Sequence, residues 1–378
     1  MKCGRSQSEP DMKTLKVGVI GCGGNSDFHL MVYHSLKGVQ LSGVCDIQEN
    51  LAKEKAARWK AEHIYTDYRL MLDLDLDLVD IITPTPTHVE IANAAMQSGK
   101  HVLVEKPMAL TSEECRDMIT TSKKTDKTLC VFHNLRFLDS VQKTKAALEA
   151  EGLTVSRSRF SYFFAQPYKG FTPAWAFEEE TGGILWDAMV HHTYLLEYLL
   201  GKIDSVYAIA AKIRKPVNDS LTLILNSKGR PGICEYEWDV KETQRTVQLL
   251  TTAGDRFDID LSHDFMRRKS RRSGGRWRSA YMALADDITL PILKWGHHVG
   301  NFLRTQSYRE GLPMEKAYFK VIGQVVSYMK GLATSQPVTG EEGLRSILVL
   351  EAARRSLQSG RVEPVGVDNE FSSDGTSL

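Results

Sequence analysis

Short apolar runs alternate with amphipathic stretches along the first third of the chain. The apolar runs predict strands at 15–20, 39–45, 78–82, 101–104 and 128–132. The stretches between them predict helices at 26–37, 49–60, 87–98 and 111–123. Repeated strand–helix–strand units predict a parallel sheet covered on both faces, and right-handed crossovers make it doubly wound.

The pattern changes after residue 135. Helices are expected at 136–150 and 184–200, and strands at 154–164, 203–212, 219–227, 231–239, 244–252 and 256–260. Turn signals such as Ser227-Lys228-Gly229 separate the later strands, which predicts an α+β region with a large open, mainly antiparallel sheet. Two long helices, near 314–333 and 340–359, follow.

These patterns divide the chain into an α/β domain and an α+β domain. The first domain spans 13–134 and follows a flexible tail at 1–12. The second spans 135–363 and is expected to hold substrate and to form subunit contacts, while its terminal helices can pack back on the first domain. Residues 364–378 are predicted to be disordered.

Composition excludes several classes of partner. With 48 basic and 47 acidic residues the net charge is +1, which gives no overall attraction to nucleic acid or to anionic membranes. No stretch approaches the ~18 uninterrupted apolar residues of a membrane span, and residues 1–13 lack the apolar run of a secretion signal. None of the six cysteines forms a CxxC pair, so we expect reduced thiols, no metal site and a cytoplasmic protein.

A glycine-rich turn joins the first strand to the first helix. Gly21 and Gly23 match the first two glycines of the dinucleotide-binding fingerprint, and Ser26 replaces the third. Such a turn, with Gly24 and Asn25, lets the backbone and the helix N-terminus approach a pyrophosphate, as in a Rossmann domain.

The second predicted strand ends at Asp46. A carboxylate there can accept hydrogen bonds from the adenosine ribose and would repel a 2′-phosphate, so NAD is favoured over NADP. The competing interpretation of Asp46 is a helix N-cap, and the two roles can coexist.

Three further motifs resemble one family. Thr83-Pro84-Thr85 and His88 follow one strand, Glu105-Lys106-Pro107 ends the next, and Gly182-Gly183 precedes Asp187 and His191. Together they resemble the Gfo/Idh/MocA oxidoreductases over about residues 13 to 360.

The resemblance implies roles for individual residues. Lys106, Asp187 and His191 match the catalytic group, with Asp187 and His191 also contacting substrate, and the Lys106–Pro107 bond is expected to be cis. The implied cofactor contacts are Thr83, Pro84, His88, Glu105 and Lys106, and the implied substrate contacts include Asn134, Arg136 and Trp175. Ala176 departs from the family, where an arginine is common.

The chemistry of this group is consistent with oxidation of a hydroxyl. Asp187 and His191 are four residues apart in a helical pattern, hence on one face. A histidine can accept the hydroxyl proton, and a lysine can stabilise the developing negative charge on oxygen. A metal interpretation of the Asp–His pair lacks third and fourth ligands.

The basic segment 267–278 allows two interpretations. A solvated loop is favoured, and an anion-binding patch for an acidic substrate is the alternative. The sequence therefore predicts an NAD-dependent dehydrogenase acting on a secondary hydroxyl of a sugar or polyol, as a homodimer or homotetramer. The alternatives are an NAD-dependent glycoside hydrolase with the same site and a non-enzymatic NAD-sensing protein.

Overall fold

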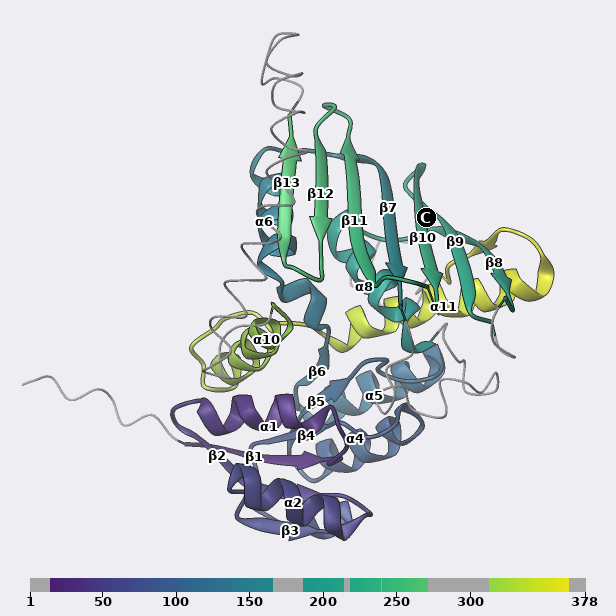
Figure 1. Cartoon of the computed structure of the whole chain (residues 1–378). Helices are drawn as coiled ribbons and strands as arrows, with labels where there is room; N and C mark the ends of the chain where they lie inside the picture. Colours follow the sequence, from purple (N-terminus) through teal and green to yellow (C-terminus); the bar gives the residue numbers. More distant parts are fainter. Residues whose placement is uncertain (1–13, 166–185, 214–217, 239, 271–312, 367–378) are drawn as a thin grey trace, which may run out of the picture. The chain divides into compact units, whose positions relative to one another are not determined.

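The structure is a computed structural model that describes residues 14–165, 186–213, 218–238, 240–270 and 313–366 (Figure 1). Two compact units make up the chain, and neither is one continuous stretch of sequence. The first contains residues 1–105, 117–132 and 318–340. The second contains residues 106–116, 133–317 and 341–378.

The first unit contains a six-stranded parallel sheet with the strand order β3-β2-β1-β4-β5-β6. The order reverses direction between β1 and β4, so this sheet is doubly wound, as predicted. Its strands are β1 (Leu15–Ile20), β2 (Val39–Cys45), β3 (His63–Tyr65), β4 (Leu78–Ile81), β5 (His101–Glu105) and β6 (Leu129–Phe132).

Helices connect these strands. They are α1 (Ser26–Ser35), α2 (Glu49–Trp59), α3 (Tyr68–Met71), the 3₁₀ turn η1 (Thr85–Thr87), α4 (His88–Gln97) and α5 (Ser112–Thr125). Right-handed crossovers place α1 and α2 on one face of the sheet and α4 and α5 on the other. The sequence pattern missed β3 and α3 because three or four residues are too few to establish a period.

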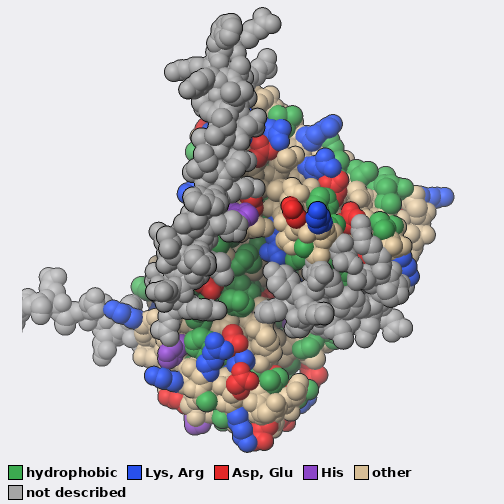
Figure 2. Space-filling view, in the orientation of Figure 1, with side chains coloured by type: hydrophobic (Ala, Val, Ile, Leu, Met, Phe, Trp, Pro, Cys, Tyr) green, Lys and Arg blue, Asp and Glu red, His purple; other side chains and the backbone are tan. Residues whose placement is uncertain are grey.

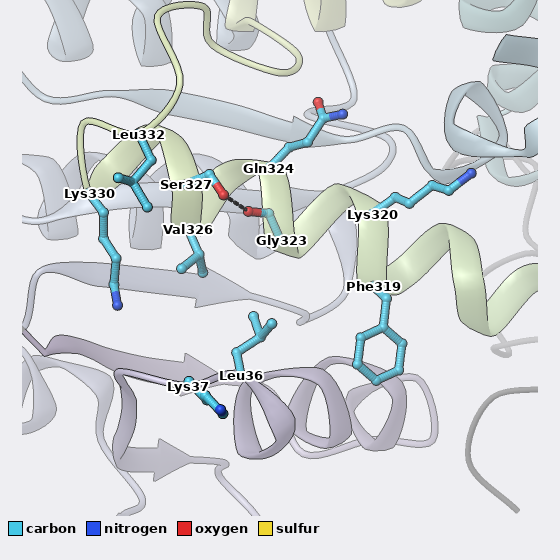
Figure 3. Close-up of a pocket in the computed structure, with 10 residues that line it drawn as sticks. All are labelled: Leu36, Lys37, Phe319, Lys320, Gly323, Gln324, Val326, Ser327, Lys330 and Leu332. Atoms are coloured by element: carbon cyan, nitrogen blue, oxygen red, sulfur yellow. Dashed lines mark hydrogen bonds between the residues drawn. The ribbon is translucent and has the colours of Figure 1, made fainter. Parts of the chain in front are cut away.

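Most of helix α10 (Pro313–Met329), from Tyr318 onward, belongs to the first unit although it lies far from the rest of that unit in sequence. Its buried Val321, Ile322 and Val325 add to the core, and the Tyr318 ring lies 4.7 Å from that of Phe132. Between α10 and the C-terminal end of α1 lies a hollow of about 400 Å³ that carries three lysines (Figure 3). None of the predicted cofactor residues lines it.

The second unit contains an eight-stranded sheet with the order β13-β12-β11-β7-β10-β9-β8-β14. Only β7 and β10 pair in parallel, so the sheet is mainly antiparallel, as predicted. Its strands are β7 (Val155–Phe163), β8 (Ser205–Ala211), β9 (Ser220–Ser227), β10 (Arg230–Glu237), β11 (Gln244–Thr251), β12 (Arg256–Asp260), β13 (Phe265–Lys269) and β14 (Glu363–Pro364).

Helices cover one face of this sheet. Its helices are the 3₁₀ turn η2 (Asn134–Phe137), α6 (Asp139–Ala150), α8 (Met189–Leu200) and α11 (Gly340–Ser359). In α11, buried Ser356 Oγ accepts a hydrogen bond of 2.9 Å from the backbone N–H of Ala208 in β8. No helix of the described residues covers the opposite face, the open sheet face, and Figure 2 shows apolar and charged side chains mixed on its visible part.

Three boundary predictions were wrong. Residues 267–269 belong to strand β13 and pair with β12, so the basic segment does not begin as a loop; residues 271–278 lie outside the described part. Pro364 pairs in β14 and Val365 is buried, so the ordered chain continues past 363. The predicted helix at 184–200 is interrupted: Trp186 and Asp187 are helical, Ala188 is a turn, and α8 with His191 begins at Met189. The predicted tail at 1–12 lies outside the described residues.

Within the described ranges, no helix is both long enough and apolar enough to span a bilayer. The same ranges contain five buried cysteines that form no disulfide with one another, namely Cys22, Cys45, Cys115, Cys130 and Cys234.

Candidate active site

The turn after β1 requires glycine at its first position. Gly21 has a φ of +99°, and a Cβ there would lie 2.7 Å from the backbone carbon of Ile82. Gly23 and Gly24 are exposed, and no atom lies within 4 Å of the Cβ that either would carry. Ser26, which replaces the third glycine, is fully buried and donates 2.6 Å from its hydroxyl to the Gly23 carbonyl.

This turn fits a dinucleotide pyrophosphate. Open space lies above Gly23 and Gly24, and α1 begins immediately after the turn. The side chain of Asn25, the N-cap residue of α1, makes no capping hydrogen bond to the helix, while the backbone N–H of Ser26 donates to the Gly23 carbonyl at 3.1 Å. An anion here would meet the positive end of the helix dipole. These residues would hold NAD by its phosphates.

Asp46 ties the glycine turn to the end of β2. Its carboxylate accepts from the backbone N–H of Cys22 and from that of Gln48, both at 2.8 Å. Helix α2 begins at Glu49 with Gln48 as its N-cap, so the N-cap interpretation of Asp46 was wrong. The remaining lone pairs of the carboxylate suit the ribose hydroxyls of NAD.

Glu105 lies at the end of β5 in a buried polar network. Its Oε1 accepts a 2.9 Å hydrogen bond from the Asn25 side-chain amide and lies 3.1 Å from His29 Nε2. His29 Nδ1 lies 2.8 Å from Asp80 Oδ2. Burial alone would lower the pKa of His29, but Asp80 and Glu105 raise it to about 9. His29 is therefore an imidazolium between two carboxylates at neutral pH.

The residues after β4 stand beside the glycine turn. The backbone nitrogen of Thr83 lies 2.9 Å from the position that a Cβ on Gly21 would occupy. His88 is buried, and its Nε2 lies 2.8 Å from the Thr83 carbonyl oxygen. The carbonyl of the exposed Pro84 accepts from the Thr87 hydroxyl at 2.8 Å. The first unit thus brings the predicted cofactor residues together, apart from Lys106.

Lys106 follows Glu105 directly and belongs to the second unit. The Lys106–Pro107 peptide bond is cis, as the resemblance implied. Lys106 Nζ donates to Asp187 twice, at 2.9 Å to the backbone carbonyl and at 3.1 Å to Oδ1. Asp187 therefore holds the ammonium by both its side chain and its backbone.

The segment around Asp187 is fixed by the residue before it. Trp186 is completely buried, and its indole N–H donates 2.9 Å to the Leu110 carbonyl. The guanidinium of Arg354 lies 3.9 Å from the Trp186 ring centroid. These contacts hold Asp187 where it meets Lys106.

His191 lies in the first turn of α8 and is half-buried. Burial, followed by the positive charge of Lys106, holds its pKa well below the ordinary 6.5. The ring is therefore neutral at physiological pH and able to accept a proton. Its Nδ1 lies 2.8 Å from the hydroxyl of Tyr194, one turn further along the helix.

The structure joins Asn134 to the same group. Its Oδ1 accepts from the Tyr194 hydroxyl at 3.1 Å. His133, which lies between β6 and η2, stacks on the Tyr194 ring at 4.1 Å between centroids. Burial and nearby arginines hold the pKa of His133 well below 6.5, so this histidine is neutral too.

One predicted substrate residue, Arg136, is engaged by other side chains, and a second lies outside the described residues. Arg136 donates 2.7 Å to Glu342 Oε1, and its guanidinium lies 4.4 Å from the Tyr198 ring centroid. These contacts anchor Arg136 within its unit, and a substrate would have to compete with Glu342 for it. Trp175 and the neighbouring Ala176 lie outside the described residues.

Sequence reasoning missed Tyr194, His29 and Asp80. Tyr194 follows His191 by three residues in an apolar helix, a spacing that places both on one face. Asp80 interrupts the apolar run of β4, and a charge within a buried strand indicates a buried partner. Both patterns are visible in the sequence, but only the structure shows which residues these side chains contact.

Comparisons with known proteins agree with this arrangement. Residues 15–133 match the model of an oxidoreductase family with an NAD-binding Rossmann fold, and residues 143–256 match the GFO/IDH/MocA C-terminal domain. The chain is 23% identical to D-apiose dehydrogenase of Paraburkholderia graminis, over 94% of this chain and 91% of that protein. It is 30% identical to levoglucosan dehydrogenase of Pseudarthrobacter phenanthrenivorans, over 52% of this chain and 54% of the relative.

A solved structure shares the complete fold. The WlbA dehydrogenase of Bordetella pertussis, in complex with NADH and UDP-GlcNAcA, superposes with a TM-score of 0.76 at 20% identity. The match covers 94% of this chain and all of the other (100%). The two family models, one for each half of the fold, show that the chain belongs to the Gfo/Idh/MocA family of NAD-binding oxidoreductases.

Proposed function

We propose that this protein is an NAD-dependent dehydrogenase in which Lys106, Asp187 and His191 act on a secondary hydroxyl of a sugar or polyol. The observation that carries the proposal is the Lys106–Asp187 ion pair beside a neutral His191. Burial lowers the pKa of His191 most and the positive charge of Lys106 lowers it further, so an ammonium and a neutral imidazole share one site.

Each side chain has a defined task. His191 accepts the proton of the substrate hydroxyl, and the Lys106 ammonium stabilises the negative charge that develops on that oxygen. Asp187 holds Lys106 in place through its two hydrogen bonds. NAD supplies the hydride acceptor when bound, held by the glycine turn and Asp46.

The substrate class follows from relatives of the chain. The names of two relatives refer to D-apiose and levoglucosan, and one solved structure contains UDP-GlcNAcA. All three are carbohydrates or carbohydrate derivatives. We therefore expect a polyhydroxylated substrate, with a carboxylated or phosphorylated sugar as the acidic variant.

NADH formation tests the proposal directly. Sugars, inositols, uronates and nucleotide sugars would be offered with NAD to the wild type and to His191→Ala, and nicotinamide absorbance recorded. We expect turnover by the wild type on at least one class and a loss of about 10²-fold or more in the variant. Equal turnover by both proteins would refute the role of His191.

One relative favours a second candidate. The chain is 35% identical to Alpha-N-acetylgalactosaminidase of Shewanella oneidensis, over 34% of this chain and 30% of that protein. A glycoside hydrolase of this kind would use the same residues without net NADH formation. Release of free sugar from an α-glycoside, with constant nicotinamide absorbance, would favour this alternative.

We also propose that the protein is a cytoplasmic homodimer or homotetramer. Five buried, unoxidised thiols support a reducing compartment. The open sheet face carries the exposed Ile209, Ile224 and Leu250, which supports a subunit contact there. Neither nucleic acid nor membrane is expected as a partner.

A further inference from the structure

Among the described residues, three polar groups of the second unit form hydrogen bonds with the hydroxyl of Tyr194. His191 Nδ1 lies 2.8 Å away, Asn134 Oδ1 lies 3.1 Å away, and the backbone N–H of Leu135 donates to the hydroxyl at 3.2 Å. Tyr194 is only 2% exposed. Helix α8 supplies Tyr194 and His191, and the turn η2 supplies Asn134 and Leu135.

The hydrogen-bonding capacity of a phenol determines which group donates. A tyrosine hydroxyl has one proton and two lone pairs. The Leu135 N–H can only donate, so it occupies one lone pair. Asn134 Oδ1 can only accept, so it takes the phenol proton. The remaining lone pair faces His191 Nδ1, which must therefore carry a proton and donate it.

This assignment leaves the other ring nitrogen as the base. A neutral imidazole has one protonated nitrogen, so a proton on Nδ1 gives Nε2 the free lone pair. Among the described residues, none makes a hydrogen bond with Nε2 of His191. The Nε2 atom is thus the one that can accept the substrate proton.

The phenol itself is held rigidly. His133 stacks on it with an angle of 9° between ring planes, and both side chains are buried. Tyr194 therefore cannot rotate its hydroxyl away from His191 without displacing a packed ring. Because the phenol is uncharged, it orients the imidazole without adding a full negative charge to stabilise an imidazolium.

We propose that Tyr194 is a positioning residue that fixes the Nδ1–H tautomer of His191 and so directs the Nε2 lone pair to the substrate hydroxyl. The inference rests on the proposed role of His191 as proton acceptor. It adds that a neutral tyrosine, oriented by Asn134 and the Leu135 backbone, selects the nitrogen that acts.

The tautomer can be measured without any substrate. Long-range ¹H–¹⁵N spectra of the 378-residue chain with ¹⁵N-labelled histidine distinguish the two ring nitrogens, and His191→Gln identifies the signals of His191. We expect a protonated Nδ1 and an unprotonated Nε2 in the wild type. In Tyr194→Phe this preference disappears. A wild type with the proton on Nε2, or a pattern unchanged in Tyr194→Phe, would overturn the proposal.

A second variant reverses the preference while keeping the tyrosine. In Asn134→Leu the phenol loses its proton acceptor and can donate to His191 Nδ1, so we expect the proton to move to Nε2. Persistence of the Nδ1–H form would contradict the assignment. The control is Tyr198→Phe, in the same helix but packed on Arg136, which leaves the His191 signals unchanged.

Kinetics separate positioning from simple loss of structure. Once a substrate is known, Tyr194→Phe is expected to lower kcat by about 10- to 100-fold, with KM changed less than about twofold. A rise in KM with constant kcat would oppose a positioning role. Absence of NADH formation by the wild type would refute the proposed function, whereas the tautomer measurement would still decide the role of Tyr194.

Discussion

At the scale of single residues, the first unit depends on a few positions where only one side chain fits. Gly21 is such a position, because it combines a left-handed backbone with contact on the neighbouring strand end. Gly24, three residues later, has neither constraint. We therefore expect the fold to require glycine at position 21, and cofactor binding to require it at position 24.

Gly21→Ala is expected to destabilise the protein by on the order of 1–3 kcal/mol, because its Cβ meets the backbone of Ile82 and Thr83. Gly24→Ala should change stability by less than about 0.5 kcal/mol, yet weaken NAD binding by filling the open space above the turn. Denaturant unfolding and NAD titration of both variants test this pair. Equal unfolding midpoints would contradict the expectation.

His29 predicts a pH dependence of stability. Its pKa rises from 6.5 to about 9 on folding, so the folded state binds its proton more tightly than the unfolded state. The resulting stabilisation is complete below the unfolded pKa and is lost as pH rises from 6.5 to about 9. Asp80 and Glu105 face the ring from β4 and β5.

We expect the free energy of unfolding of the wild type to fall through this window by on the order of 1–3 kcal/mol more than that of His29→Gln. Urea unfolding of both proteins at a series of pH values measures the difference. Parallel pH curves for the two proteins would rule out a buried imidazolium at His29.

At the scale of elements, α10 is far in sequence from the strands of the first unit but packs with them. Its residues follow nearly the whole second unit in the chain, yet Tyr318 donates 3.0 Å to Asn25 Oδ1. Lys330 Nζ donates to the Gly38 carbonyl at 2.6 Å. The helix therefore completes the unit that carries the glycine turn.

Ile322→Ala should lower stability by about 2–5 kcal/mol because it empties a fully buried site on α10. Gln324→Ala, two residues along the same helix but exposed, should change it by less than about 0.5 kcal/mol. Thermal and denaturant unfolding provide the measurement. A small effect at Ile322 would mean that α10 contributes little to the core.

At the scale of the whole molecule, the open sheet face remains to be explained. Ile224 in β9 lies opposite Tyr207 in β8 and Ile233 in β10, so its neighbours on this face are also apolar or aromatic. Ile224 is 44% exposed in the single chain. A second copy would remove this surface from water.

Ile224→Lys is expected to shift the proposed oligomer toward monomers, since it places a charge in the subunit contact. Asn226→Lys is the control, because residue 226 is exposed two positions along the same strand and faces the same side. Light scattering over a concentration series measures both variants. An unchanged mass for Ile224→Lys would place the subunit contact elsewhere.

The sequence by itself determined the architecture and most of the candidate cofactor site. Hydrophobic periodicity is a local property, so it predicted the parallel strands and the antiparallel sheet that the structure contains. The turn at Gly21 and the strand end at Asp46 are local too. Short strands such as β3 and β14 were not predicted, because pairing with a neighbouring strand defines them and their own sequence is too short to show a pattern.

Tertiary structure alone decided which side chains meet. His29, Asp80 and Glu105 come from three separate elements, and no local pattern links them. The same holds for Lys106 with Asp187, 81 residues apart, and for Asn134 with Tyr194, 60 apart. The surroundings of each histidine then determined its charge: Asp80 and Glu105 raise the pKa of His29 against the effect of burial, whereas burial and then the charge of Lys106 lower that of His191. The sequence shows which functional groups a chain carries, but the partners and the protonation state of each group depend on what the fold packs around it.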